Sequence, residues 1–159
     1  MTLAYVGVGA NLGQPARQVE QALAELDRMP QSRVLKRSSL YRSAPVGYAD
    51  QPDFVNAVAQ LETGLAAERL LTELQEVEAR HGRSRSFANA PRTLDLDLLM
   101  FEALQTKSAR LTLPHPRMHE RAFVLKPLVE VAPDASIPGH GRAAELLARL
   151  GEQRVERIA

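Results

Sequence analysis

The amino-acid sequence predicts an α+β fold, in which helices cover an antiparallel sheet. Two hydrophobic patterns carry this prediction, because apolar residues alternate with period two in some segments and recur every three or four residues in others. Along the chain these patterns follow one another in the order β-α-β-β-α-β. The length of the chain is consistent with one folded domain, since 159 residues with 45% hydrophobic content can bury a sufficient core without disulfides or a structural metal. We therefore expect residues 1–159 to form a single domain.

The N-terminal part of the pattern predicts a strand followed by a helix. Residues 3–8 form a short aliphatic run that predicts a strand, and the small residues 9–13 are typical of a turn that ends it. From Pro15 onward the apolar positions have helical spacing, and a proline suits the first turn of a helix. We expect Pro30 to end this first helix.

Two extended segments come next. Residues 34–41 predict the second strand, and residues 42–52, which contain Pro and Gly, predict a long loop. Residues 54–62 predict the third strand. Because side chains alternate along a strand, Phe54 and Asn56 are expected to point to the same face.

The next elements complete a ferredoxin-like βαββαβ core. Residues 66–81 predict a second helix that Gly82 ends, and residues 93–101 predict a fourth strand. In the ferredoxin-like order both helices lie on one face of an antiparallel sheet. The rest of the chain predicts further helices at 118–131 and 143–150. We expect this C-terminal α/β extension to pack on the same core, in α-β-α layers.

Composition excludes several functions. The absence of cysteine excludes thiol catalysis, zinc-thiolate sites and iron–sulfur clusters. A formal net charge of +1, with only 3 Tyr and 4 Phe, disfavours bulk nucleic-acid binding. The sequence contains no apolar run long enough to span a membrane, and its first residues lack the basic region of a signal peptide. We expect a cytoplasmic protein that binds neither nucleic acid nor membrane.

Asp95 and Asp97 are the most informative residues. On a strand, residues i and i+2 lie on one face about 6.5–7 Å apart, so the two carboxylates converge on one point. Such hard oxygen ligands suit Mg²⁺, which often binds one or two carboxylates together with substrate phosphates. The alternative is a half-exposed edge strand with solvated aspartates, and the pattern alone does not decide between the two.

A basic segment precedes these aspartates. Four arginines occur between Glu78 and Asp95 without an intervening acid, namely Arg80, Arg83, Arg85 and Arg92. Guanidinium groups bind phosphate oxygens through a bidentate fork, although a solvated basic loop has the same composition. Together with the paired carboxylates, this segment indicates a nucleotide phosphate with Mg²⁺. Neither a P-loop nor a dinucleotide-binding glycine motif is present to explain such a site.

Four ordered blocks make the prediction specific: SLYRSAPVG at 39–47, DQPDFVNA at 50–57, PRTLDLD at 91–97 and LPH at 113–115. With these blocks the chain resembles the 6-hydroxymethyl-7,8-dihydropterin pyrophosphokinases of folate biosynthesis, from residue 5 to about residue 133. The resemblance implies an α+β ferredoxin-like core and two Mg²⁺ ions. It also implies transfer of pyrophosphate from ATP to the pterin hydroxymethyl group, with release of AMP.

The resemblance also implies roles for individual residues. Asp95 and Asp97 would bind both metal ions, and the catalytic set would be Arg83, Arg92, Asp95 and Asp97. The ATP site would consist of Gln75, Glu78, Arg83, Arg85, Arg92, Arg110, Thr112, His115 and Arg121. The pterin site would consist of Ser43, Ala44, Pro45, Val46, Phe54, Asn56, Asp95 and Phe123. No residue is assigned as a general base.

The chain departs from the family between Gly82 and Pro91, where one residue fewer is present and Ala88-Asn89 replaces an Arg-Trp pair. We expect Phe87 to take the place of the aromatic residue. The alternatives to the family function are another Mg-dependent transferase, an RNA-binding ferredoxin-like module, and a noncatalytic ligand sensor. The RNA-binding alternative is disfavoured because strand four carries aspartates rather than aromatics. We expect a monomer, since a site of this type needs no partner chain.

Overall fold

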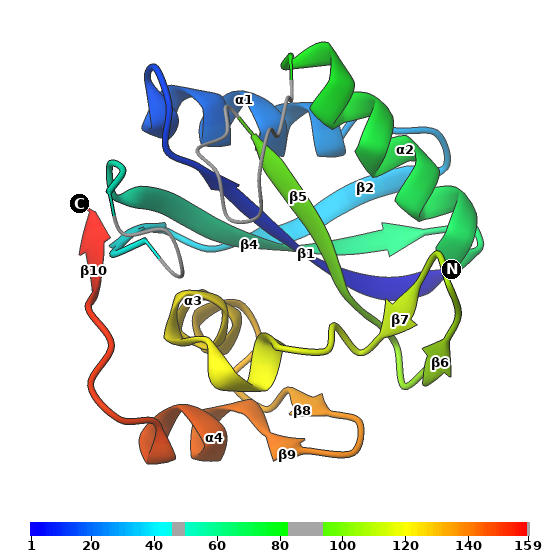
Figure 1. Cartoon of the computed structure of the whole chain (residues 1–159). Helices are drawn as coiled ribbons and strands as arrows, with labels where there is room; N and C mark the ends of the chain where they lie inside the picture. Colours follow the sequence, from blue (N-terminus) through cyan, green and yellow to red (C-terminus); the bar gives the residue numbers. More distant parts are fainter. Residues whose placement is uncertain (46–49, 83–93, 159) are drawn as a thin grey trace.

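The structure is a computed structural model that describes residues 1–45, 50–82 and 94–158. It has three layers, with α1 (Pro15–Leu26) and α2 (Ala67–Arg80) above the sheet and α3 (Ala122–Val131) and α4 (Ala143–Arg149) below it (Figure 1). The predicted α+β class is therefore confirmed. In the described part of the chain no helix is both long enough and apolar enough to cross a membrane.

The described residues form one main sheet of six strands. These are β1 (Thr2–Ala10), β2 (Ser32–Arg37), β3 (Leu40–Ser43), β4 (Phe54–Thr63), β5 (Asp95–Phe101) and β10 (Val155–Ile158). The strand order is β10-β3-β4-β1-β5, β2 also pairs with β4, and all pairs are antiparallel. This is the predicted ferredoxin-like order, with β2 and β3 together in the place of one strand.

Each face of the sheet has its own hydrophobic core. Val55, Ala57, Ala59 and Leu61 of β4 face α1 and α2, whose apolar stripes supply residues such as Val19 and Leu74. On the other side, Val58 packs with residues of α3, which include Leu125 and Leu128. The alternation predicted for this strand is therefore confirmed, and the opposite face is where α3 lies.

The prediction that residues 34–41 form a single strand is wrong. It divides into β2 and β3 at Ser38 and Ser39. The hydroxyl of Ser38 accepts a hydrogen bond from the Val58 N–H at 2.9 Å, and the Ser39 N–H donates to the Glu130 carboxylate at 3.0 Å. These side-chain contacts replace the regular ladder, so the chain bends at this point.

Two further boundaries differ from the prediction. Strand β1 continues to Ala10 instead of ending at a turn that begins with Gly9, because its register with β4 and β5 extends through Gly9. Helix α1 ends at Leu26, before Pro30, and the Asp27 carboxylate then accepts the Val34 N–H at 2.8 Å. This hydrogen bond turns the chain back toward β2.

The C-terminal extension contains the expected helices and several short strands that the pattern did not predict. The predicted helical stretch at 118–131 is a 3₁₀ turn, η1 (Met118–Glu120), followed by α3. The short strands pair as β6 (Thr106–Lys107) with β7 (Thr112–Leu113) and as β8 (Ser136–Ile137) with β9 (Gly141–Arg142). Strand β10 pairs with β3 and so extends the main sheet.

Candidate active site

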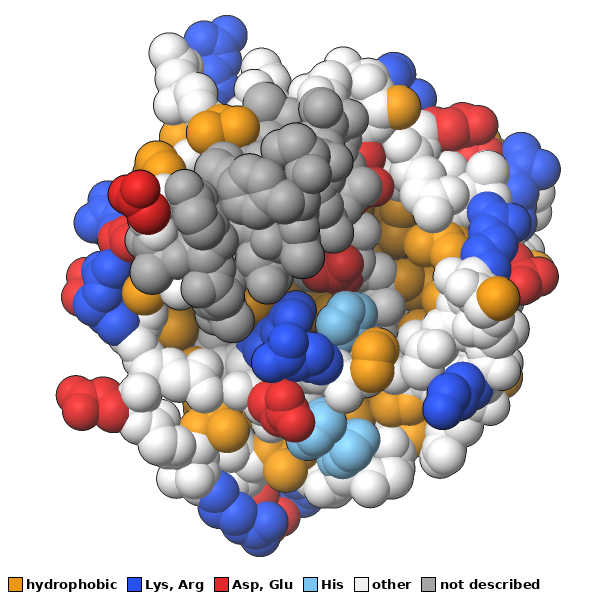
Figure 2. All heavy atoms as spheres, viewed as in Figure 1, with side chains coloured by type: hydrophobic (Ala, Val, Ile, Leu, Met, Phe, Trp, Pro, Cys, Tyr) orange, Lys and Arg blue, Asp and Glu red, His pale blue; other side chains and the backbone are white. Residues whose placement is uncertain are grey.

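A cavity of about 220 Å³ lies between the lower face of the sheet and α3. It is lined by Gly7, Val8, Gly9, Ser43, Ala44, Phe54, Asn56, Ala57, Val58, Asp95, Asp97, His115, Arg121, Phe123 and Val124. Basic, acidic and histidine side chains gather near the middle of the face shown in Figure 2. The cavity therefore combines aromatic walls with charged groups, as small-molecule sites do.

Two glycines of β1 form the floor of the cavity. Gly9 is the register partner of Asn56 on β4 and of Asp95 on β5, while Gly7 pairs with Val58 and Asp97. A Cβ atom at Gly9 would stand 3.0 Å from the Asn56 Oδ1 atom. Strand β1, which lies between β4 and β5, therefore leaves space between the amide on one side and the carboxylates on the other.

This role of the glycines differs from the sequence prediction, in which Gly9 belongs to a turn. The signal that was available is the two-residue spacing of Gly7 and Gly9 next to a predicted strand. At that spacing both positions share one face, and a glycine inside a strand often marks a close approach of a ligand or another group.

Asp95 and Asp97 both line the cavity from β5 and are half-buried. Leu94, Leu96 and Leu98 are buried on the other face, against α1 and α2, because side chains alternate along a strand. Strand β5 is an edge strand of the sheet, but its two carboxylates face a cavity. In residues 1–45, 50–82 and 94–158, no group of three or more Asp, Glu or His side chains is placed to bind a metal ion.

Two carboxylates in one cavity nevertheless fit Mg²⁺, because this ion commonly takes its remaining ligands from water and substrate phosphates. The backbone between them is held by Glu78 of α2. This residue is only 6% exposed, and its Oε2 atom accepts the Leu96 N–H at 2.7 Å. Glu78 thus fixes the strand at the residue between the two aspartates.

Besides Asp95, several of the residues predicted for the pterin line the cavity from β3, β4 and α3. The Asn56 amide donates to the Ser43 hydroxyl at 2.6 Å, and both side chains are at most 5% exposed. Phe54 lines the cavity from β4 and Phe123 lines it from α3. Ala44 also lines the cavity; Pro45 is described but does not line it, and Val46 lies outside the described residues.

His115 and Arg121 line the cavity near the carboxylates. Burial, together with the positive charge of Arg121, lowers the pKa of His115 to about 4, and this effect outweighs the opposing charge of Asp95. His115 is therefore neutral at pH 7. Its backbone N–H donates to the Leu99 carbonyl at 2.9 Å, and the Leu113–Pro114 peptide bond that precedes it is cis.

Other residues predicted for ATP lie elsewhere. Gln75 is exposed on α2, Thr112 is half-buried on β7, and the exposed Arg110 donates a hydrogen bond to the Thr72 hydroxyl. None of these lines the cavity in the described residues. The predictions for Arg83, Arg85, Arg92 and Phe87 fall outside the described residues.

A family model described as 7,8-dihydro-6-hydroxymethylpterin-pyrophosphokinase (HPPK) matches residues 5–133. The chain belongs to the HPPK family. It is 46% identical to the 2-amino-4-hydroxy-6-hydroxymethyldihydropteridine pyrophosphokinase of Pseudomonas aeruginosa, over 97% of this chain and 95% of that protein. It is 39% identical to the protein of the same name from Haemophilus influenzae, over 99% of each chain. The resemblance stated from the four sequence blocks is therefore confirmed.

Solved structures agree at the level of the fold. The structure of wild-type Plasmodium falciparum HPPK-DHPS matches with a TM-score of 0.72 at 11% identity. That match covers 93% of this chain but 44% of the Plasmodium chain, so the present chain spans less than half of that protein. Because the curated HPPK relatives are pyrophosphokinases, the alternatives of an RNA-binding module and of a noncatalytic sensor are set aside.

Proposed function

We propose that the cavity between the sheet and α3 is the active site of this HPPK-family enzyme. The family assigns an ATP-dependent transfer of pyrophosphate to the hydroxymethyl group of 6-hydroxymethyl-7,8-dihydropterin, a step of folate biosynthesis. The pterin hydroxymethyl oxygen attacks the β-phosphorus of ATP and releases its proton to water, the bond from this phosphorus to the AMP oxygen breaks, and AMP leaves with that oxygen. The observation that carries the assignment is that Asn56 and Asp95 flank the same glycine, Gly9, on one wall of the cavity.

The pterin is proposed to bind at Ser43, Ala44, Pro45, Val46, Phe54, Asn56, Asp95 and Phe123. A flat heteroaromatic ring between Phe54 and Phe123 gains stacking and burial. The Asn56 amide supplies both a donor and an acceptor to the ring's polar edge, and its bond to Ser43 supports a single orientation. In the proposed orientation the hydroxymethyl group points toward the carboxylates of β5.

Asp95 and Asp97 are proposed to hold Mg²⁺, with two ions expected. When bound, Mg²⁺ neutralises charge on the ATP phosphates and helps to orient them. The two aspartates supply oxygen ligands from one strand face, and Glu78 prevents that strand from shifting by accepting the Leu96 N–H. Phosphoryl transfer depends chiefly on positioning and on neutralisation of charge, so no general base is required of the chain.

The ATP phosphates are proposed to contact Arg121 and His115 and, by the family motif, Arg83, Arg85 and Arg92. Arg121 offers a permanent positive charge at the cavity wall. Neutral His115 offers an N–H donor rather than a charge, because its pKa is about 4. Gln75, Glu78, Arg110 and Thr112 complete the proposed ATP site, although their described contacts lie outside the cavity.

We further propose that residues 1–159 act as a single domain and as a cytoplasmic monomer, without nucleic acid or membrane. The packing of the C-terminal extension supports the single domain, because α3 covers one face of the sheet, α4 packs on α3, and β10 pairs with β3 at the edge of the sheet (Figure 1). Sedimentation equilibrium of the purified chain tests the monomer directly, and a stable dimer would contradict it.

The reaction is tested by incubating the purified chain with ATP, Mg²⁺ and 6-hydroxymethyl-7,8-dihydropterin, with a control that lacks the pterin. We expect AMP and a pyrophosphorylated pterin in equal amounts, and no AMP in the control. Formation of ADP would show transfer of a single phosphoryl group and would overturn the assigned reaction. Absence of any product in the presence of Mg²⁺ would also overturn the assigned reaction.

A further inference from the structure

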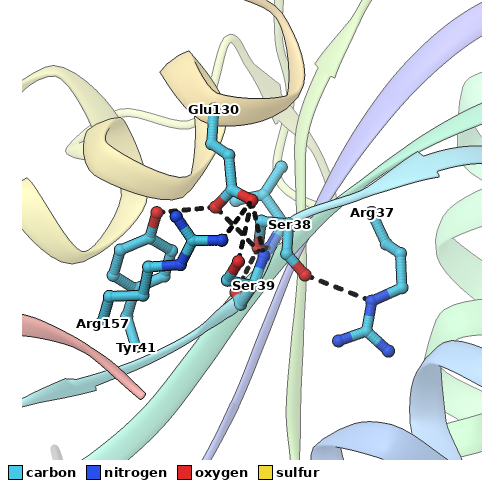
Figure 3. A network of polar contacts seen from close by, with 7 residues as sticks. Arg37, Ser38, Ser39, Tyr41, Glu130 and Arg157 are labelled. Carbon is cyan, nitrogen blue, oxygen red and sulfur yellow. Dashed lines mark hydrogen bonds and ion pairs between the residues drawn. The ribbon is translucent and has the colours of Figure 1, made fainter. Parts of the chain in front are cut away.

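Glu130 of α3 makes a cluster of hydrogen bonds outside the cavity. Its carboxylate accepts the Ser39 N–H at 3.0 and 3.1 Å, the Ser39 hydroxyl at 2.9 Å and the Tyr41 hydroxyl at 2.6 Å. Figure 3 shows this side chain reaching from the helix to the bend between β2 and β3. Arg157 of β10 adds a positive charge 3.9 Å away. One side chain thus joins α3 to two neighbouring strands.

The elements that Glu130 joins carry opposite walls of the cavity. Phe123 lies seven residues before Glu130 on α3, which is about two helical turns, so both side chains project from the same side of the helix. Tyr41 precedes Ser43 by two residues on β3, so these two also share one face. In the register with β4, Tyr41 pairs with Asn56. The Glu130 carboxylate therefore connects the two elements that carry the opposite walls of the proposed pterin site.

The protonation states of Tyr41 and Glu130 favour a strong hydrogen bond between these two residues. Burial raises the pKa of Tyr41 to about 12, and the hydrogen bond to Glu130 adds to this effect, so the tyrosine remains a donor. Burial also opposes ionisation of Glu130, but hydrogen bonds from Tyr41 and Ser39 outweigh it and lower the pKa of this carboxyl. At pH 7 an ionised acceptor thus meets several donors, which is the stronger and more directional kind of hydrogen bond.

Apolar packing holds α3 against β3 and β4 without this contact. The Tyr41 ring packs with Ala122 and Val155, and Phe123 lies against the same cluster. Such packing favours burial but is not directional, whereas four hydrogen bonds to one carboxylate define how the helix is placed on the strand. Pterin stacking between Phe54 and Phe123 depends on that placement.

We propose that Glu130 is a positioning residue for pterin binding, whose carboxylate sets the separation between Phe123 and the Asn56–Ser43 pair. This inference rests on the proposed function. It assigns no contact between Glu130 and either substrate. It predicts that loss of the carboxylate weakens pterin binding while ATP binding at the β5 end of the cavity is kept.

The test compares Glu130→Gln, Tyr41→Phe and the double variant with the unmodified chain. Glu62→Gln is the matched control, because it neutralises a carboxylate that is paired with Arg33 at 3.0 Å on the sheet, away from the cavity. Calorimetric titrations measure the Kd of a nonhydrolysable ATP analogue with Mg²⁺, and then the Kd of the pterin on the nucleotide-saturated protein. Thermal unfolding of each variant is recorded in parallel.

We expect each single variant to raise the pterin Kd roughly tenfold, with the nucleotide Kd unchanged. In the double variant the loss of pterin binding free energy should be smaller than the sum of the two single losses. A variant with lower thermal stability but an unchanged pterin Kd would overturn the inference and leave Glu130 a purely structural role. If Glu130→Gln does not fold, Tyr41→Phe decides, because it keeps the packed ring and removes only the hydroxyl. Failure of the unmodified chain to bind the pterin would instead count against the proposed function.

Discussion

Asn56 and Asp95 lie on opposite sides of Gly9, which is the register partner of both residues. Neighbouring strands are about 4.8 Å apart, so the amide and the carboxylate are separated by two strand spacings, roughly 10 Å at the backbone. A side chain on the middle strand would fill the space between them. The glycine thus lets one flat substrate reach both the hydrogen-bonding group and the carboxylates.

Gly9→Ala should weaken pterin binding. Its methyl group would stand 3.0 Å from the Asn56 Oδ1 atom, so the amide must move by a few tenths of an ångström, which strains its hydrogen bond with Ser43. We expect a loss of about 1 kcal/mol, or roughly fivefold in the pterin Kd. Gly151→Ala is the control, because this residue does not line the cavity and its methyl group would meet no atom within 4 Å. Equal changes in the pterin Kd for the two variants would contradict this role of Gly9.

Asp95→Ala and Asp97→Ala should each abolish turnover while leaving the fold intact. Each removes a carboxylate from a half-buried cavity position and spares the leucines that pack on the other face. We expect a loss of about 100-fold or more in kcat, as for other groups that stabilise transition-state charge. Asp134→Ala, at an exposed surface ion pair, serves as the control. Near-normal kcat in either cavity variant would refute the metal assignment.

Glu78→Ala should destabilise the fold. The variant leaves the buried Leu96 N–H without the acceptor that now lies 2.7 Å away, which costs about 1–3 kcal/mol. Urea denaturation followed by circular dichroism measures this loss. Glu76→Ala, on the exposed face of the same helix, should change stability by less than about 0.5 kcal/mol. If both variants have the same stability, the Glu78 contact contributes nothing to holding β5.

The stability of the metal-free and nucleotide-free chain should fall below pH 6.5 because of His115. Its pKa is about 4 in the folded state, against the ordinary histidine value of 6.5 in the unfolded chain, so between these values the unfolded chain binds more protons. Stability therefore decreases as the pH falls through this window, by about 1–3 kcal/mol. Above pH 6.5 this dependence disappears. His115→Asn should show a shallower decrease in urea denaturation, and an unchanged pH dependence would contradict the prediction.

Local patterns were sufficient for several features of the site. Alternation along a strand predicted that Asp95 and Asp97 share a face of their strand, and that Phe54 and Asn56 share a face of theirs. Both predictions are correct because a two-residue repeat is a property of the extended backbone itself. The four sequence blocks predicted the family, and the comparisons confirm it.

Other features depend on contacts between distant residues. The break between β2 and β3 involves Ser39 and Glu130, which are 91 residues apart in the chain. The edge strand β10 forms only because β3 offers unpaired backbone groups to the C-terminus. Neither feature has a local signal, since serines and a short polar tail occur in loops and strands alike.

The sequence alone is sufficient to predict the class of fold, the alternation that groups the site residues, and the family to which the chain belongs. These follow from backbone periodicity and from motifs that are local in the chain. The position of Gly9 between Asn56 and Asp95, and the contact of Glu130 that joins α3 to β3, are visible only in the folded chain. Register and helix placement result from packing and hydrogen bonds between segments far apart in sequence, so they appear only when the chain is folded.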